Sequence, residues 1–284
     1  MTLKEITIQS TELLKKSDFI SSPALEARIL ICSVLQLDLK KFFLNLENHI
    51  VNDIELQSIQ LLVSKRIAGR SIASIIGYQE FYDCQFFVDD SVLIPRPDTE
   101  IIVEHIIKIV HDKKLSNAID IGTGPGTIAI SVAKHCKELQ IDAIDISRKA
   151  LELCAKNIQF NIPGNTTINI FEADIAHYTT TKKYDLIMSN PPYIPSNVVT
   201  EILSNHTVDD PVISLDGGIT GLELYHAIKR FAQESLIKGG IIILEHGYDQ
   251  KNAMMEIFNN DGFVYKECII DYGNNDRGCI IERL

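Results

Sequence analysis

The stretch Met-Ser-Asn-Pro-Pro-Tyr-Ile-Pro (residues 188–195) places an amide and three prolines directly after an apolar run. Proline lacks the N–H that a central strand needs and holds the residue before it extended, so the run must end here. Asn190 and Pro191 offer a side-chain oxygen and a backbone carbonyl, which are hydrogen-bond acceptors and not bases. Together they suit a planar NH₂ group, and Tyr193 can stack on a flat substrate. The alternative for this NPPY segment, from Asn190 to Tyr193, is a simple proline-rich turn.

A glycine-rich loop follows the first strand-like run of the second half, in Ile-Asp-Ile-Gly-Thr-Gly-Pro-Gly-Thr-Ile-Ala-Ile (residues 119–130). Such a loop lets a ligand approach the backbone, with a helix N-terminus directly behind it. A dinucleotide fingerprint has its third small residue one position later, where Thr127 stands, so a nicotinamide cofactor fits imperfectly. The alternative is a tight strand-to-helix turn. The members of this glycine loop are Gly122, Thr123, Gly124, Pro125 and Gly126.

Carboxylates end the next two strand-like runs. Asp145 lies about twenty residues beyond the glycine loop, where a carboxylate can accept hydrogen bonds from both hydroxyls of a ribose. Asp142 is the poorer candidate because it falls inside the run, and Asp145 could instead start the next helix. Asp174 would lie beside the same crevice, unless it is an ordinary turn aspartate. The glycine loop and Asp145 together indicate an adenosine-containing ligand without saying which one.

The elements that must position these residues alternate between strand and helix. Strand-like runs cover residues 118–121, 141–146, 167–171, 185–189, 241–244, 263–269 and 279–281, and helical patterns cover residues 99–110, 128–136, 150–159, 222–236 and 253–258. This alternation predicts an α/β fold with a parallel sheet covered on both faces. Only a Gly-Asn turn at residues 273–274 separates the last two strands, so we expect the final strand to run antiparallel.

The chain ahead of this region has a different character. Residues 1–74 show helical periodicity, with Asn52 and Glu55 spaced as a capping box, and they predict a small all-α domain. Residues 75–97 turn aromatic and β-prone, and Asp89-Asp90 signals a turn, so we expect a β-hairpin linker. Residues 98–284 then form the domain that carries the chemistry.

Composition narrows the class of protein. The chain has 284 residues, 45% of them hydrophobic and 23% charged, with no apolar run long enough to span a membrane and no secretory signal. Six cysteines without a C-x-x-C pair favour reduced thiols in a cytoplasmic protein, and eight histidines without ligand spacing predict no metal site. The net charge of −11 disfavours direct nucleic-acid binding. Lys65, Arg66 and Arg70 form the only tight basic cluster, typical of a solvated helix end. We expect a monomer.

The glycine loop, Asp145 and the NPPY segment, in this order, resemble the amino-methylating branch of the S-adenosylmethionine-dependent methyltransferases. Adenine-N6 nucleic-acid methyltransferases and glutamine methyltransferases share the NPPY sequence. Pro-Arg-Pro-Asp-Thr-Glu (residues 95–100) and the segment with Leu-Asp-Gly-Gly (residues 210–222) are more specific. Together they resemble the peptide chain release factor N5-glutamine methyltransferases over essentially the whole chain. The family usually has Glu where this chain has Asp210, and often Ser where it has Pro125.

The resemblance implies a Rossmann-like class I methyltransferase with a mostly parallel seven-stranded sheet, preceded by a helical substrate-recognition domain. It implies S-adenosyl-L-methionine as cofactor and, as substrate, the Gly-Gly-Gln glutamine of class I peptide chain release factors. No general base is required, because a methylated amide cation loses its proton readily. The cofactor-binding residues implied are Gly122, Thr123, Gly124, Pro125, Gly126, Asp145, Asp174, Ile175 through its backbone N–H, and Asn190. The substrate-binding residues implied are Asn190, Pro191, Pro192, Tyr193 and Arg96, with Asn190 and Pro191 as the catalytic pair.

Two other functions remain open at this point. An adenine-N6 methyltransferase acting on DNA or RNA would use the same NPPY segment on a flipped base. The acidic charge and the lack of an added base-reading domain after the NPPY segment count against it. A cofactor-binding fold retained as a scaffold is the second alternative, because a fold alone never proves activity.

Overall fold

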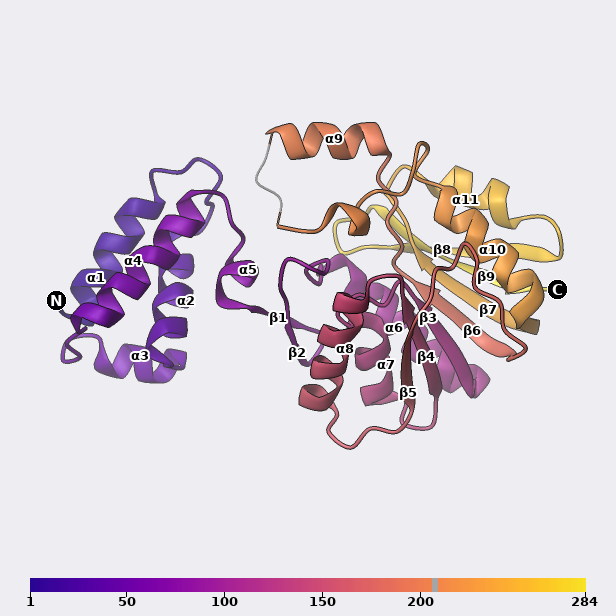
Figure 1. The fold of residues 1–284 in the computed structure, drawn as a ribbon, viewed down its shortest axis with the longest axis horizontal. Coiled ribbons are helices and arrows are strands. Elements are labelled where there is room, and N and C mark those ends of the chain that lie inside the picture. The colour runs from indigo at the N-terminus through magenta and orange to yellow at the C-terminus, as the bar shows by residue number, and fades with distance from the viewer. Residues whose placement is uncertain (206–208) are drawn as a thin grey trace. The chain divides into compact units, whose positions relative to one another are not determined.

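The structure, a computed structural model, describes residues 1–205 and 209–284. The chain divides into two compact units, which are described separately (Figure 1). The helical unit comprises Met1–Gly77 with Asn205–Asp209, and the sheet unit comprises Tyr78–Ser204 with Asp210–Leu284. In the described part of the chain, no helix is long and apolar enough to cross a membrane.

The helical unit packs five helices around an apolar core. They are α1 (Leu3–Leu14), α2 (Pro23–Leu35), α3 (Leu39–Asn45), α4 (Asp53–Ile67) and α5 (Ile72–Ile76). The capping box expected from Asn52 and Glu55 is present at the start of α4, and Thr2 forms another with Glu5 at the start of α1. The buried side chains of this core include Leu3, Ile6, Leu14, Leu30, Ile31, Phe42, Ile59 and Val63.

A two-stranded hairpin opens the sheet unit, formed by β1 (Tyr78–Phe81) and β2 (Cys84–Phe87). Its turn lies at Tyr82 and Asp83, both with positive φ, as a tight two-residue hairpin requires. The turn expected at Asp89-Asp90 is present, with Val92 N donating to Asp89 O (3.4 Å). The strand expected at residues 92–94 is wrong, because β2 pairs with β1 through the turn at Tyr82 and Asp83.

The hairpin is also part of the sheet unit rather than a free linker. The Asn161 side chain on α8 (Arg148–Asn161) accepts a hydrogen bond from Gln85 N (3.0 Å) and donates one to Gln85 O (2.9 Å). The Asn157 side chain accepts from Phe87 N (2.8 Å). Two asparagines one helical turn apart therefore pair with the free edge of β2.

A seven-stranded sheet forms the body of the sheet unit, in the order β5-β4-β3-β6-β7-β9-β8. Its strands are β3 (Asn117–Ile121), β4 (Gln140–Asp145), β5 (Ile168–Glu172), β6 (Tyr184–Ser189), β7 (Leu236–Glu245), β8 (Phe263–Ile270) and β9 (Asp276–Arg283). All neighbouring pairs are parallel except those of β9, which runs antiparallel to both β7 and β8. The predicted mostly parallel sheet with an antiparallel final strand is confirmed.

Helices cover both faces of this sheet, as the alternating pattern predicts (Figure 1). On one face lie α6 (Asp98–Lys113), α7 (Thr127–His135) and α8, and on the other lie α10 (Glu223–Ser235) and α11 (Lys251–Phe258). The apolar core between the layers includes Ile119, Ile187, Tyr225, Ile242, Leu244 and Ile281. Two elements between β6 and α10 were not expected from the sequence, α9 (Ser196–Asn205) and the 3-10 turn η1 (Val212–Ser214).

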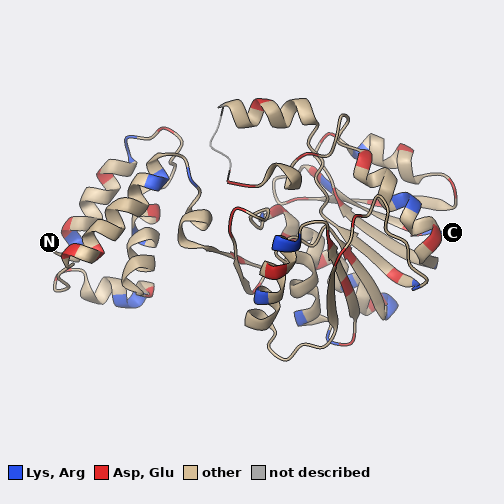
Figure 2. Ribbon diagram, in the orientation of Figure 1, with Lys and Arg blue, Asp and Glu red and all other residues tan. Residues whose placement is uncertain are grey.

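Charged side chains are mixed in sign over both units. Figure 2 shows Lys and Arg interspersed with Asp and Glu along the helices and loops of the described chain. This distribution agrees with the formal net charge of −11 and gives no continuous basic strip in that view.

Candidate active site

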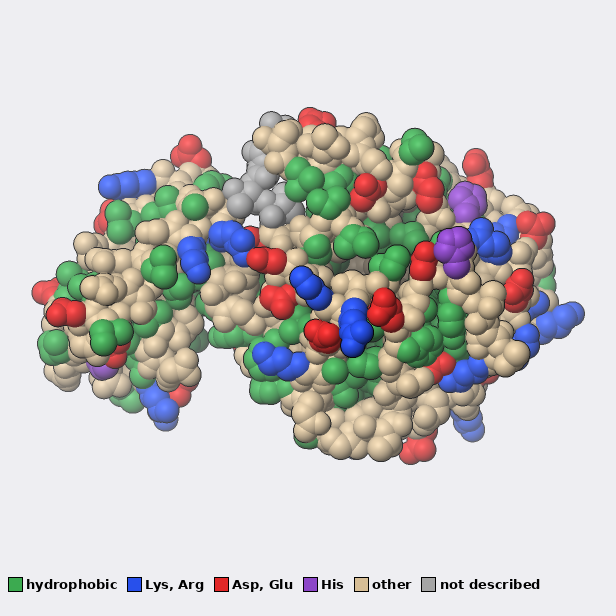
Figure 3. All heavy atoms as spheres, in the orientation of Figure 1, with side chains coloured by type: hydrophobic (Ala, Val, Ile, Leu, Met, Phe, Trp, Pro, Cys, Tyr) green, Lys and Arg blue, Asp and Glu red, His purple; other side chains and the backbone are tan. Residues whose placement is uncertain are grey.

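A cavity of about 380 Å³ opens at the carboxyl ends of β3, β4 and β6. This edge is where open parallel sheets bind ligands, because loops of neighbouring strands diverge there. The cavity wall includes most of the residues that the sequence singles out: Arg96, Gly122, Thr123, Gly124, Pro125, Asp145, Asp174, Ile175, Asn190, Pro191 and Pro192. The space-filling view shows hydrophobic side chains gathered on the visible face of the sheet unit, with acidic and basic side chains among them (Figure 3).

Two glycines of the glycine loop expose their backbone. Gly122 and Gly124 have φ of +69° and +56°, and a Cβ on either would meet no atom within 4 Å. The strain of a left-handed backbone, rather than crowding, therefore favours glycine at both positions. The Thr123 N–H donates to Ile144 O (2.9 Å), which ties the loop to the end of β4.

Gly126 has a different role from the one expected. It does not line the cavity, and a Cβ there would come within 2.6 Å of Ile130 Cδ1 and 2.8 Å of Cys154 Sγ. The third glycine therefore allows the start of α7 to pack closely against α8, and its predicted contact with a cofactor is not seen in the cavity wall.

Asp145 anchors the glycine loop from the end of β4. Its Oδ2 accepts from Gly124 N (2.9 Å) and its Oδ1 accepts from Ser147 N (2.8 Å). Each carboxylate oxygen has a second lone pair, so acceptor capacity remains for a ribose. Burial raises the pKa of Asp145 above its ordinary value. Asp142 is engaged elsewhere, by Lys182 Nζ (2.8 Å) and Tyr184 Oη (2.7 Å), so Asp145 is the aspartate of this strand that faces the cavity.

Asp120, at the end of β3, is a cavity residue that the sequence analysis missed. It is 1% exposed, and its Oδ2 accepts from Thr123 Oγ1 (2.7 Å) and Ala129 N (3.2 Å). Among the described residues, its Oδ1 has no hydrogen-bond partner. Burial raises the pKa of this carboxyl to about 7. Its position two residues before the glycine loop was the available signal. An incompletely paired carboxylate in a cavity wall suits a cationic ligand.

Asp174 and Ile175 form the wall beyond β5. The Asp174 Oδ1 accepts from Ala176 N (2.9 Å), so this aspartate does shape a turn, and it also lines the cavity. Ile175 also lines the cavity, and its side chain belongs to the buried core. A backbone N–H beside a carboxylate is an arrangement that can read an adenine edge.

The NPPY segment is braced from behind by the Leu-Asp-Gly-Gly segment. Ile194 N donates to Leu215 O (3.1 Å), and Gly217 N donates to Ile194 O (2.9 Å). A Cβ on Gly217 would lie 2.7 Å from Pro192 O, so only glycine lets the two segments lie this close. These contacts explain why the two motifs occur together, since one positions the other.

Tyr193 is the predicted site residue of the NPPY segment that does not line the cavity. Its side chain packs against the core, and burial raises its pKa to about 12. Its carbonyl oxygen accepts from Gln250 Nε2 (3.0 Å). In this structure Tyr193 therefore anchors the segment, and its stacking on a substrate stays a prediction.

Arg96 lines the cavity and forms an ion pair with Asp210, whose Oδ1 also accepts from Ile94 N (2.9 Å). The pair joins the Pro-Arg-Pro-Asp-Thr-Glu segment to the start of the segment that braces the NPPY prolines. The structure thus gives Arg96 a positioning contact, and its predicted contact with substrate stays a prediction.

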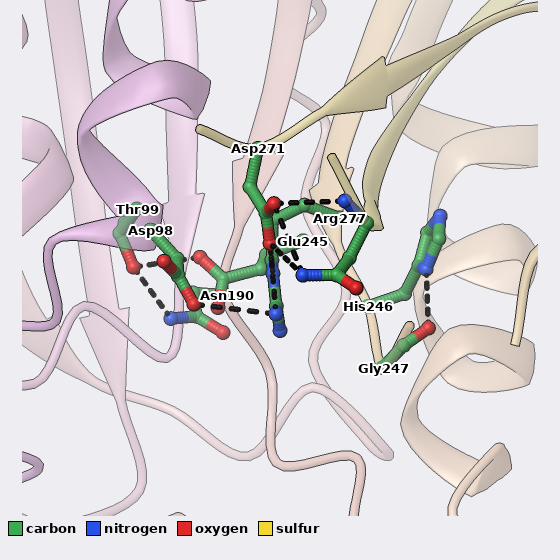
Figure 4. Close-up of polar contacts among 9 residues, drawn as sticks. Asp98, Thr99, Asn190, Glu245, His246, Gly247, Asp271 and Arg277 are labelled. Atoms are coloured by element: carbon green, nitrogen blue, oxygen red, sulfur yellow. Dashed lines mark hydrogen bonds and ion pairs between the residues drawn. The ribbon is translucent and has the colours of Figure 1, made fainter. Parts of the chain in front are cut away.

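Asn190 has two partners behind it that the sequence analysis did not assign. Its Nδ2 donates to Thr99 Oγ1 (3.3 Å), and Thr99 Oγ1 donates to Glu245 Oε2 (2.6 Å) (Figure 4). Thr99 lies in the first turn of α6 and Glu245 ends β7, so the contact depends on the strand order of the sheet. Within residues 1–205 and 209–284, no group of three or more His, Cys, Asp or Glu is placed to hold a metal ion.

Comparison with known proteins decides the family. Residues 97–218 match the model described as the methyltransferase small domain, and residues 5–77 match the PrmC N-terminal domain. A release factor glutamine methyltransferase of Aliivibrio fischeri is 34% identical, over 90% of this chain and 89% of that protein. Proteins of the same name from Agrobacterium fabrum and Clostridium acetobutylicum are 32% and 30% identical, over 91% and 98% of this chain and 90% and 97% of their own. The chain belongs to the release factor glutamine methyltransferase family.

Membership in the release factor glutamine methyltransferase family confirms the resemblance found in the sequence and the predicted enzyme class. Among solved structures, the hMettl16 catalytic domain in complex with MAT2A 3'UTR hairpin 6 is similar with a TM-score of 0.55 and 14% identity, over 82% of each chain. At that identity the likeness concerns the fold alone, and it agrees with the predicted Rossmann-like class I methyltransferase architecture.

Proposed function

We propose that this chain transfers a methyl group from S-adenosyl-L-methionine to the side-chain amide nitrogen of a release factor glutamine. The glutamine is that of the Gly-Gly-Gln motif of class I release factors. The observation that carries the proposal is the shared wall of one cavity. The paired acceptors of Asn190 and Pro191 line the same space as the glycine loop and Asp145, as a nitrogen methyltransferase needs.

The charges and hydrogen-bonding groups of the cavity residues match those of this cofactor. S-adenosylmethionine carries a ribose diol, an adenine and a positively charged methionine end. Asp145 would hold the diol, Asp174 and the backbone of Ile175 would hold the adenine, and the incompletely paired Asp120 would face the cationic end. The bound cofactor would supply an electrophilic methyl group on its sulfonium.

The chain's own task in the reaction is positioning. A carboxamide nitrogen is a poor nucleophile because its lone pair is delocalised into the carbonyl. Asn190 Oδ1 and Pro191 O can accept the two N–H groups of the substrate amide and aim its nitrogen into the cavity. The same two dipoles stabilise the positive charge that develops on the nitrogen, and they are already in place before reaction. No base is required, because the product cation is acidic.

We propose that the helical unit binds the release factor at a surface outside the Gly-Gly-Gln motif. A single glutamine offers little surface to recognise, so discrimination must come from contacts remote from the reacting amide. The helical unit presents large exposed apolar side chains that can supply such contacts: Leu44, Ile50, Ile54 and Leu61.

We further propose that the enzyme acts in the cytoplasm as a monomer. All six cysteines are unpaired, as expected in a reducing compartment. One chain supplies the whole cavity wall described above, so no second copy is needed to complete it.

The direct test is mass analysis of a class I release factor co-expressed with this chain. A gain of one methyl group on the Gly-Gly-Gln glutamine is expected. An assay with tritiated cofactor, offering release factor and nucleic acid side by side, separates the alternatives. Label in DNA or RNA at adenine, with none in the release factor, would establish the adenine-N6 function instead.

A further inference from the structure

A chain of two hydrogen bonds leads from Asn190 into the protein interior. Asn190 follows β6, Thr99 lies in the first turn of α6, and Glu245 is the last residue of β7. Figure 4 shows dashed lines from Thr99 to each of the other two side chains. Thr99 and Glu245 are each 2% exposed, so water does not compete for these contacts. Glu245 does not line the cavity and can act on a substrate only through its neighbours.

The chemistry of the three groups determines which one donates and which one accepts in each of the two hydrogen bonds. An ionised carboxylate can only accept, so the Thr99 hydroxyl must donate its proton to Glu245 Oε2 (2.6 Å). Only lone pairs of Thr99 Oγ1 then remain toward Asn190, and these accept from the amide nitrogen (3.3 Å). An Asn190 turned the other way would bring two acceptors together. The amide oxygen is therefore left on the side away from Thr99.

We infer that Thr99 and ionised Glu245 are positioning residues, which keep the Asn190 amide oxygen available to the substrate NH₂ group. This inference rests on the proposed function, because an available oxygen matters only if the substrate donates an N–H. It also explains why threonine occupies position 99. An apolar side chain of the same shape could neither donate a hydrogen bond to Glu245 nor accept one from Asn190.

Charged groups around Glu245 act on its ionisation in both directions. Burial, the largest cause, and the Asp98 charge raise the pKa of Glu245, while hydrogen bonding to Thr99 and Asn190 and the charge of Arg277, on β9, lower it. Arg277 is itself held by Asp98 (3.2 Å) and by Asp271 (3.1 Å), as Figure 4 shows. One guanidinium thus balances three carboxylates from α6, β7 and the β8–β9 connection.

Other titratable groups near Glu245 complete its surroundings. The Tyr193 and Tyr225 hydroxyls lie close enough for the Glu245 charge to raise their pKa values, and Tyr225 Oη donates to the Glu245 carbonyl (3.0 Å). Burial lowers the pKa of the neighbouring His246, which therefore stays neutral near pH 7. Glu245 is thus the titratable group of this cluster whose charge changes near neutral pH.

Protonation of Glu245 would reverse the chain of hydrogen bonds. Its carboxyl proton can donate to Thr99 Oγ1, and the Thr99 hydroxyl can then donate to Asn190 Oδ1, which turns the acceptor away from the substrate. Burial raises the pKa of Glu245 to about 7. The productive, ionised form is therefore present above that pH and is lost as the pH falls through it. We expect kcat to fall below pH 7.

The test compares Thr99→Val, Thr99→Ser and Glu245→Gln with the wild type, with release factor as substrate and saturating S-adenosylmethionine. Valine keeps the shape of threonine without the hydroxyl, so kcat should fall about ten- to hundredfold while the Kd for the cofactor stays within about threefold. Serine should restore most of kcat. Glutamine cannot ionise, so Glu245→Gln should lower kcat and abolish the acid limb of its pH profile.

Glu282→Gln on β9 is the matched control, because this half-buried glutamate pairs with Lys266 (3.6 Å) away from Asn190. It should keep the wild-type kcat and its acid limb. The inference is overturned if Thr99→Val retains kcat within twofold, or if wild-type kcat is constant from pH 6 to pH 8. The second criterion needs no variant to fold. If the wild type leaves release factor unmethylated while binding the cofactor, the proposed function has failed instead.

Discussion

Two buried carboxylates near the cavity differ in how they reach a ligand. Asp120 and Glu245 are both almost fully buried, and burial raises the pKa of each to about 7. Asp120 lines the cavity, and its Oδ1 has no hydrogen-bond partner among the residues that the structure describes, so it can meet a ligand directly. Glu245 lies behind Thr99 and can act only on Asn190. Position relative to the cavity, rather than charge or burial, separates a cofactor-side group from a substrate-side one.

Asn190→Ala should distinguish the substrate side of the cavity from its cofactor side by the largest effect. It should lower kcat by roughly 100- to 1,000-fold, because the substrate amide loses an aimed acceptor in the transition state. Cofactor affinity should stay within a few-fold, measured by calorimetric titration. A loss in kcat below fivefold would remove Asn190 from the role given to it here.

Asp145→Ala should act on the cofactor side. Loss of charge-assisted acceptors for two ribose hydroxyls costs roughly 1.5–3 kcal/mol, or about 10- to 150-fold in affinity. The structure adds a second cause, because Gly124 N loses its partner and the glycine loop loosens. Calorimetric titration measures the effect, and kcat at saturating cofactor should change less. Unchanged binding would mean that the ribose is held elsewhere.

Asp120→Asn should weaken cofactor binding about tenfold, since the cationic end of the ligand loses a negative partner. The same substitution should weaken binding but raise the stability of the folded protein. Because the pKa of Asp120 is raised above its unfolded value, the folded protein gains stability from protonation, and this gain is lost as the pH rises through about 7. At pH 8 the cofactor-free variant should therefore melt at a higher temperature than the wild type. A lower melting temperature together with normal binding would contradict the assignment.

The smallest effect is expected from the helical unit. Ile54 is 77% exposed on α4, and Ile54→Ser should raise KM for intact release factor a few-fold by removing part of a remote contact. Steady-state kinetics with a short Gly-Gly-Gln peptide should show no change. Ile270→Ser on β8 is the matched exposed control. Equal effects of both variants on intact release factor would argue against recognition by the helical unit.

The sequence was sufficient for features that depend on neighbouring residues. Alternating strand and helix patterns predicted the sheet and its antiparallel last strand, because periodicity and connection type are local properties. The glycines at positions 122 and 124 permit the positive φ found there, and the rigidity of Pro191 and Pro192 follows from their covalent structure. The carboxyl-edge rule then places Asn190 and Asp145 near one another without coordinates.

The tertiary structure decided features that depend on which strands become neighbours. Thr99 and Glu245 are far apart in the chain, and only the placement of β7 beside β6 brings Glu245 behind Asn190. The packing role of Gly126 depends on Cys154 of α8, and the inward position of Tyr193 depends on the core. Long-range packing determines which side chains meet and which buried groups lack a partner. Neither property can be predicted from local sequence, because each depends on residues far apart in the chain.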